Sequence, residues 1–182
     1  ALEKIYGTDF GMTKAPGFLQ TAAFMESMTG TTGKPFNYSD AGGNGSFNPA
    51  MFWLANKVKD PSLLWVEKSY LKIEKSDNLV RERILPAIML WKGQIVTKDI
   101  KAPITTAFVG KGKNPMALMR TSWTDSNAIY IAAKGGSASI NHAHMDIGSF
   151  IMDADGQRWA MDFGMQDYES LESKGVKLWG RT

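Results

Sequence analysis

Residues 141–150 read Asn-His-Ala-His-Met-Asp-Ile-Gly-Ser-Phe and contain both histidines of the chain, His142 and His144. An aspartate, Asp146, follows at the same interval of two positions. In an extended segment these three side chains project from one face, because side chains in a strand alternate with a period of two. The segment therefore concentrates metal-binding or proton-transferring groups in a chain that has no other histidine.

Short runs of β-prone residues surround this segment, from Gly93 to the C-terminus. Turn-forming residues separate the runs, and Asp155-Gly156 between two of them is a strong signal for a two-residue hairpin. This hairpin brings Asp162 back beside the histidine segment. We expect strands within 95–96, 105–109, 116–119, 128–132, 149–152 and 159–161.

The preceding part of the chain, from Pro16 to about Lys92, has helical periodicity. Pro16 predicts the start of a first helix, and Pro86 predicts a kink or an end in a fourth helix. Residues that favour helix starts stand at Asn48, Asp60 and Asp77. Between the first and second helices, residues 31–45 form a loop rich in glycine, serine, threonine and asparagine.

Helices followed by strands predict an α+β protein with separate layers rather than a wound α/β sheet. We place a boundary between a helical unit, residues 1–92, and a strand-rich unit, residues 93–182. The tryptophans of the helical unit lie in helical patterns, so we expect Trp53, Trp65 and Trp91 to pack in a core.

Composition sets a few bounds on function. The 182 residues are 43% hydrophobic and carry a net charge of +3, a mild bias compatible with an acidic partner and no indication of nucleic acid. The absence of cysteine excludes disulfides and thiolate metal sites. No apolar run approaches the roughly 18 to 20 residues of a membrane span, and no signal peptide opens the chain. The two ends read as those of a segment of a larger protein.

Zinc is the metal that the histidine pair favours, because it prefers nitrogen and oxygen ligands in a tetrahedral arrangement. Asp162, returned by the hairpin, could complete a site with His144. Asp146 is a candidate to orient a ligating imidazole, since such rings usually donate their other nitrogen to a carboxylate. A fourth protein ligand is not evident from these residues.

The histidine segment, together with Ala-Asp-Gly at 154–156 and Trp-Ala-Met-Asp-Phe-Gly at 159–164, resembles the heparinase II/III-like family of polysaccharide lyases. The stretch 36–42, Phe-Asn-Tyr-Ser-Asp-Ala-Gly, is similar to the last part of that family's helical domain. The resemblance implies the end of an incomplete α/α toroid in residues 1–92, followed by the start of an antiparallel β-sandwich in residues 93–182. It also implies a periplasmic or secreted protein.

The resemblance implies a structural zinc ion held by His144, Asp162 and a later histidine. The later histidine has no counterpart in this chain. A partial site of this kind should bind zinc weakly or not at all.

The resemblance also implies cleavage of an acidic, uronate-containing polysaccharide, heparin-like or related, by β-elimination. His142 matches a residue of the active-site cleft, with Asn141 as a neutral donor beside it. Tyr168 is a candidate for a second cleft tyrosine, and Tyr38 for a contact with substrate, although each could instead have a packing role. The family's principal tyrosine has no match here, so we expect this segment alone to be inactive.

Three other readings stay open. A cupin-like metal enzyme also places His-X-His on a strand, but it needs a third histidine and has no preceding helical unit. A non-catalytic carbohydrate-binding module would keep the sandwich without a working cleft. A zinc hydrolase would need an open coordination position and a general base that the sequence does not define.

Overall fold

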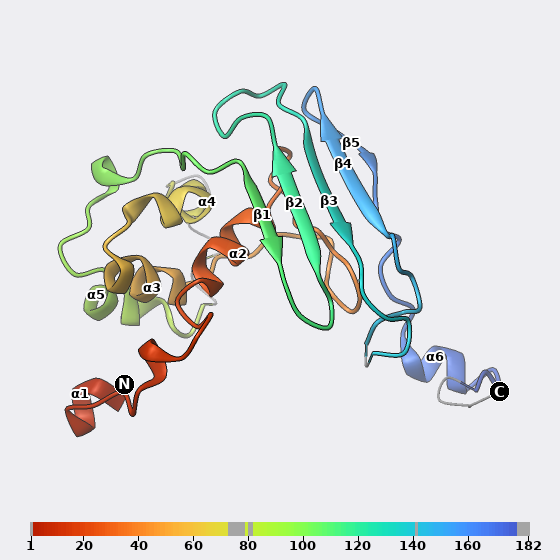
Figure 1. Cartoon of the computed structure of the whole chain (residues 1–182), viewed down its shortest axis with the longest axis horizontal. Coiled ribbons are helices and arrows are strands. Elements are labelled where there is room, and N and C mark those ends of the chain that lie inside the picture. The colour runs from red at the N-terminus through yellow and green to blue at the C-terminus, as the bar shows by residue number, and fades with distance from the viewer. Residues whose placement is uncertain (1, 73–78, 80–81, 141, 178–182) are drawn as a thin grey trace.

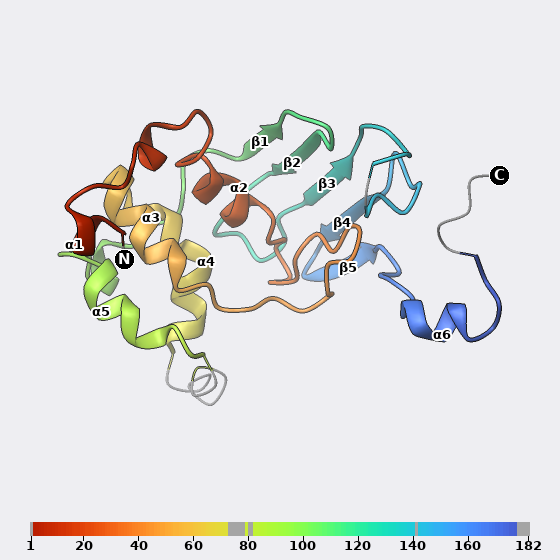
Figure 2. The same cartoon turned by 90° about the horizontal axis from the view of Figure 1, so that it is seen from below.

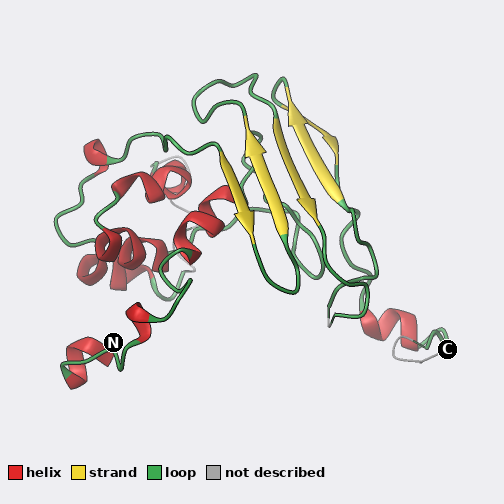
Figure 3. Ribbon diagram, in the orientation of Figure 1, coloured by secondary structure: helices red, strands yellow, loops and turns green. Residues whose placement is uncertain are grey.

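A computed structural model describes residues 2–72, 79, 82–140 and 142–177. Helices gather at one side, next to an antiparallel sheet whose strands follow one another in chain order, and a short helix lies beyond the sheet near the C-terminus (Figure 1). Figure 3 shows the same division between helices and strands. The predicted α+β class is confirmed.

The helices are short and are joined by turns of 3₁₀ helix. The α-helices are α1 (Leu2–Tyr6), α2 (Thr21–Ser27), α3 (Ala50–Val58), α4 (Trp65–Lys68), α5 (Ile88–Trp91) and α6 (Tyr168–Glu172). The 3₁₀ segments are Met12–Lys14, Pro61–Leu64, Ser69–Leu71, Leu85–Ala87 and Thr97–Asp99. None of the helices within the described ranges is long and apolar enough to cross a bilayer.

Two of the predicted helix starts are confirmed. The side-chain oxygen of Asn48 accepts a hydrogen bond from the Ala50 backbone at 3.1 Å, and Asp60 accepts one from the Ser62 backbone at 2.9 Å. Each side chain satisfies a backbone N–H that has no partner within its helix. The helix predicted at Asp77 begins outside the described residues.

Two local predictions are wrong. The helix predicted to start near Pro16 is α2, which begins at Thr21, because residues 16–20 form turns. Pro86 does not end a helix: it lies in the 3₁₀ turn Leu85–Ala87 that leads into α5. Proline is tolerated in the first turn of a helix, where its missing N–H would have no partner in any case.

The sheet contains β1 (Ala107–Gly110), β2 (Met116–Arg120), β3 (Tyr130–Lys134), β4 (Phe150–Ala154) and β5 (Gln157–Ala160), each antiparallel to the next. The predicted hairpin at Asp155-Gly156 joins β4 to β5, and both residues have the positive φ that such a turn needs, 51° and 72°. The strand expected at 95–96 is absent, because those residues lead into the 3₁₀ turn Thr97–Asp99.

The inner face of the sheet packs against α2 and the segment that follows it (Figure 2). Phe36 is fully buried there, and the Phe24 ring lies 5.7 Å from the ring of Phe108 on β1. The buried members of this core are Phe36, Met116, Leu118, Tyr130, Ala132 and Ile151. Residues from both parts of the sequence therefore build one core, and the segment after α2 is held against the sheet.

A second core lies among the helices around Met51 and Leu64. Trp53, Trp65 and Trp91 all pack against it, as predicted.

The outer face of the sheet is apolar and uncovered. The strand register aligns Val109, Ala117, Ala133 and Phe150 in one row across it, and Val109 and Phe150 are 68% and 53% exposed. In a β-sandwich a second sheet covers this face. The complete toroid, the complete sandwich and the boundary at residues 92–93 stay predictions.

Candidate functional site

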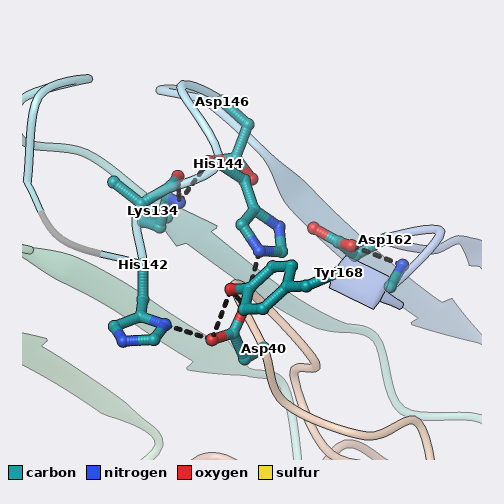
Figure 4. Close-up of polar contacts among 9 residues, drawn as sticks. Asp40, Lys134, His142, His144, Asp146, Asp162 and Tyr168 are labelled. Atoms are coloured by element: carbon teal, nitrogen blue, oxygen red, sulfur yellow. Dashed lines mark hydrogen bonds and ion pairs between the residues drawn. The ribbon is translucent and has the colours of Figure 1, made fainter. Parts of the chain in front are cut away.

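The carboxylate of Asp40 is the meeting point of three aromatic side chains (Figure 4). Nδ1 of His142 is hydrogen-bonded to it, and Nε2 of His144 lies 2.7 Å from Oδ1. The Tyr168 hydroxyl donates to the same carboxylate, at 3.1 Å from either oxygen. The structure thus brings together His142, His144 and Tyr168, which were predicted as site residues from separate arguments.

These side chains come from three distant parts of the chain. Asp40 lies in the loop between α2 and α3, the histidines lie in the loop between β3 and β4, and Tyr168 is the first residue of α6. The side chain of Asp167 caps α6 by accepting from the Ser170 backbone at 3.0 Å. The site therefore exists only when the loop after α2 is docked on the end of the sheet.

The histidine segment is not a strand, contrary to the extended conformation considered above. His142, His144 and Met145 have φ of 57°, 55° and 56°, in the left-handed region that most residues avoid. The chain must reverse here between antiparallel strands, so residues 142–149 form turns rather than a regular strand. These turns, and not a strand face, aim both imidazoles at one carboxylate.

Lys134, the last residue of β3, binds the loop that contains the two histidines. Its side chain is only 2% exposed, and its ammonium group donates to the Ala143 carbonyl at 2.7 Å and pairs with the carboxylate of Asp146. The expectation that Asp146 orients an imidazole is therefore wrong for this structure, because its partner is Lys134. Asp146 acts on the histidines indirectly, by fastening their loop to the sheet.

The shared contacts change the acidity of the site. The hydrogen bond from His144, followed by those from His142 and Tyr168, lowers the pKa of Asp40 below its usual range. Partial removal from water and the hydrogen bond to Asp40 raise the pKa of Tyr168 above its ordinary value of 10.0. At neutral pH the site therefore contains an ionised Asp40 and a protonated tyrosine.

A cavity of about 810 Å³ opens beside these residues, between the helices and the sheet. His142 lines it from the loop between β3 and β4, Asp40 and Tyr38 line it from the loop between α2 and α3, and Glu67 lines it from α4. Burial raises the pKa of Glu67 to about 7, although the carboxylate accepts a hydrogen bond from the Asn48 backbone at 2.9 Å. The volume is in the range of ligand pockets and suits several sugar units.

Tyr38 is half-buried in the wall of this cavity. Its ring lies 5.2 Å from the Phe36 ring and 5.8 Å from the ammonium of Lys134, and burial raises the pKa of its hydroxyl. The ring thus anchors its loop while still lining the cavity, which combines the two roles weighed from the sequence. Asn141, the predicted neutral donor, lies outside the described residues.

Asp162 is placed near the histidine loop, as the hairpin predicted, but it does not bond to His144. Its carboxylate accepts from the Ser149 hydroxyl at 2.9 Å and from the Gly164 backbone at 2.8 Å. Across the described residues, no three His, Cys, Asp or Glu side chains gather in a way that could hold a metal ion. His144 and Asp162 alone therefore do not make a zinc site, and zinc stays a prediction that needs a further ligand.

Three residues of the site were not predicted from the sequence: Asp40, Lys134 and Glu67. Asp40 lies in the Gly-rich stretch that resembles the lyase family, so an acidic residue in that loop was an available signal. Lys134 also gave a signal, as a charged residue ending an apolar strand. Glu67 gave none, because a glutamate in a short helix is usually solvated.

Chemically, the arrangement suits transfer of a proton. A carboxylate that accepts from Nδ1 of an imidazole fixes its tautomer and leaves Nε2 with a lone pair. The side chain of His142 is 52% exposed, so a molecule in the cavity can reach it. Tyr168 supplies a neutral O–H group to the same cluster.

No family model and no curated protein sequence matches this chain. Among solved structures, a mutant of the heparan sulfate lyase HepC from Pedobacter heparinus is similar, with 17% sequence identity and a TM-score of 0.49. The match covers 87% of this chain and 22% of the lyase chain, so these residues span about a fifth of the length of that structure.

Proposed function

We propose that this chain forms part of a lyase that cleaves a uronate-containing acidic polysaccharide by β-elimination. The observation that carries the proposal is the orientation of His142 by Asp40 at the wall of an 810 Å³ cavity. The sequence resemblance of residues 141–150 and 159–164 to polysaccharide lyases supports the same reaction.

In this reaction a base removes the proton at C5 of a uronate, and an acid protonates the leaving glycosidic oxygen. His142 is the proposed base, because Asp40 stabilises the imidazolium that forms when Nε2 takes the proton. Tyr168 is the proposed proton donor, since its raised pKa keeps it protonated at neutral pH. General acid-base catalysis of this kind typically contributes roughly 10²- to 10⁴-fold in rate.

The sugar carboxylate must be neutralised before its neighbouring proton is removed, because the step builds a second negative charge beside the first. Asn141 and Tyr38 are the proposed donors toward the substrate. Each well-placed donor in such a site contributes about 3 to 4 kcal/mol to the transition state.

Zinc is proposed only as a structural ion, held by His144, Asp162 and a ligand outside these residues. It would fasten the histidine loop to the segment after β5. Zinc content of the purified protein tests this: His144→Ala should lower both zinc content and melting temperature, whereas His142→Ala should leave both unchanged. Equal losses in the two variants would contradict the separate roles of the histidines.

The main experiment uses the longest protein that the gene encodes, incubated with heparan sulfate, chondroitin, hyaluronan and alginate. Elimination creates a double bond in the product, which ultraviolet absorbance detects. We expect absorbance to rise on at least one polymer and His142→Ala to abolish the rise while circular dichroism stays unchanged. If the polysaccharide is shortened but absorbance does not rise, the protein is a hydrolase and not a lyase.

A non-catalytic carbohydrate-binding module is the second candidate. The wide cavity favours it as much as it favours the lyase, but a binding module has no need for an oriented imidazole. Binding of a uronate polymer that leaves the polymer intact and survives His142→Ala would support this second candidate.

A further inference from the structure

A second cavity, of about 390 Å³, lies beside α4. Its walls come from the segment 29–33, from Trp65 and Tyr70, and from the loop 121–126 between β2 and β3. This loop stands at the opposite end of the sheet from the loop that carries the histidines (Figure 1). The site around Asp40 makes no use of this cavity.

The two cavities adjoin. Thr29, Val66 and Tyr70 line both of them, so the smaller cavity continues the larger one along the junction between helices and sheet. An extended polymer bound at His142 would follow this junction. Enzymes commonly use such remote contacts to position the reacting part of a long substrate.

Arg120 places a positive charge in the wall of the smaller cavity, where the carboxylate of Asp125 lies at the exposed rim. Its guanidinium stacks on the ring of Trp123, 3.3 Å from the ring centre, and donates to the Thr29 carbonyl at 2.5 Å. Burial lowers its pKa to about 10, so the group stays charged at neutral pH. Within the described ranges, Arg120 forms no ion pair with a carboxylate.

A largely buried cation without an ionic partner is uncommon, because proteins usually pair charges that they remove from water. Two carboxyl groups, Glu26 and Asp153, act on the charge of Arg120. Burial raises the pKa of Glu26 to about 8, so it is mostly protonated at neutral pH, and Asp153 is already bound to Arg158 and to Thr32. The stacked guanidinium therefore retains N–H donors suited to a planar carboxylate or a sulfate.

The rest of the wall suits a sugar. Trp65 and Trp123 provide flat apolar surface, and threonine and serine side chains provide hydroxyl groups. The hydroxyl of Thr31 is buried and has no hydrogen-bond partner among the described residues. A volume of 390 Å³ is at the small end of the range for ligand pockets, which fits one or two sugar rings.

We propose that this smaller cavity is a remote subsite that binds an acidic sugar unit of the polysaccharide, with Arg120 pairing to its carboxylate or sulfate. This inference rests on the proposed function for the identity of the polymer. The subsite places a second recognition point at the far end of the cleft and makes affinity depend on chain length.

The test measures binding by calorimetry to the His142→Ala protein, with heparan sulfate tetrasaccharide and octasaccharide as probes. Ser126→Trp fills the cavity from its exposed wall, and Asn127→Trp is the matched control, because Asn127 is exposed on the same loop but does not line the cavity. Arg120→Gln removes the charge, and circular dichroism checks that this variant folds.

We expect Ser126→Trp and Arg120→Gln to weaken octasaccharide binding by about tenfold, the loss of one charge-assisted contact. Tetrasaccharide binding and the Asn127→Trp protein should stay unchanged. Octasaccharide affinity that is equal in all proteins, or absent from the parent, overturns the subsite. If Ser126→Trp loses octasaccharide affinity but the native protein shows no elimination activity, the subsite is supported and the lyase function is rejected.

Discussion

The ammonium group of Lys134, at the end of β3, pairs with the carboxylate of Asp146 inside the loop that carries both histidines. The same group donates to the carbonyl of Ala143, the residue between them. One buried lysine therefore determines where His142 and His144 stand relative to the sheet.

Replacing Lys134 with methionine keeps the length of the side chain and removes the charge and the donors. We expect the free energy of unfolding to fall by about 1 to 3 kcal/mol, because the Ala143 carbonyl and Asp146 lose their partner. Turnover should fall as well, since the histidine loop is no longer fixed. Thermal unfolding and the lyase assay measure the two effects. Lys111→Met, at an exposed position, is the control and should match the native protein; an unchanged lyase rate in Lys134→Met would contradict the positioning role.

Asp40→Asn tests the orientation of His142. Asparagine keeps the shape of the side chain but accepts weakly and no longer stabilises an imidazolium, so turnover should fall roughly 10²- to 10⁴-fold. Nitrogen NMR of the histidine rings should show loss of the single tautomer. Asp155→Asn, in the β4–β5 hairpin, should keep full activity, because asparagine tolerates the positive φ of that turn. Native-like rates in Asp40→Asn would remove Asp40 from the mechanism.

Glu26 makes the stability of the protein depend on pH. Burial raises its pKa from 4.5 to about 8, and one of its oxygens has no hydrogen-bond partner among the described residues. Between these two pH values the folded chain binds a proton that the unfolded chain has released, so stability falls as pH rises from about 4.5 to about 8. The native protein should thus have a lower melting temperature near pH 8 than near pH 4.5.

Glu26→Gln should remove its own part of that decline, because glutamine resembles the neutral acid, and Glu67, whose pKa is raised to about 7, accounts for the remainder. We expect the variant to gain on the order of 5 kcal/mol relative to the native protein between these pH values. Melting temperatures across the range measure the gain. Glu172→Gln, at an exposed position, should follow the native curve. Parallel curves for Glu26→Gln and the native protein would show that Glu26 is ionised in the folded state.

Gly30 lies against the buried carboxylate of Asp153. A β-carbon at this position would come within 2.1 Å of Oδ2 of Asp153, which Arg158 and Thr32 already hold in place. Gly30→Ala should therefore destabilise the protein by about 1 to 3 kcal/mol, by displacing the segment 29–35 from the sheet. Gly43→Ala has open space and should change stability by less than about 0.5 kcal/mol. Denaturant unfolding compares the two variants. Equal free energies of unfolding would show that the segment 29–35 does not pack against Asp153.

Much of the fold was predictable because its signals are local. Alternating β-prone runs and the Asp155-Gly156 turn predicted the sheet from β1 to β5, and Asn48 and Asp60 predicted helix starts through their side-chain caps. Pro86 was misjudged because a proline can begin a helix as readily as it can end one.

The site was predictable only in part, because its central residue is remote in sequence. The spacing of His142 and His144 indicated a site, but their common partner, Asp40, lies about a hundred positions earlier. That pairing follows from the docking of Phe36 in the sheet core, which no short pattern encodes. The left-handed turns of the histidine loop could not be predicted either, since His142, His144 and Met145 are not glycines and such residues rarely adopt a positive φ.

The uncovered row that runs from Val109 to Phe150 has a practical consequence for anyone who purifies these 182 residues alone. An exposed apolar surface of this kind is expected to bind hydrophobic dyes and resins, and to promote aggregation with other copies of the sheet. Threonine at Val109 and lysine at Phe150 should raise the yield of dispersed protein, and both positions are on the side of the sheet away from Phe36.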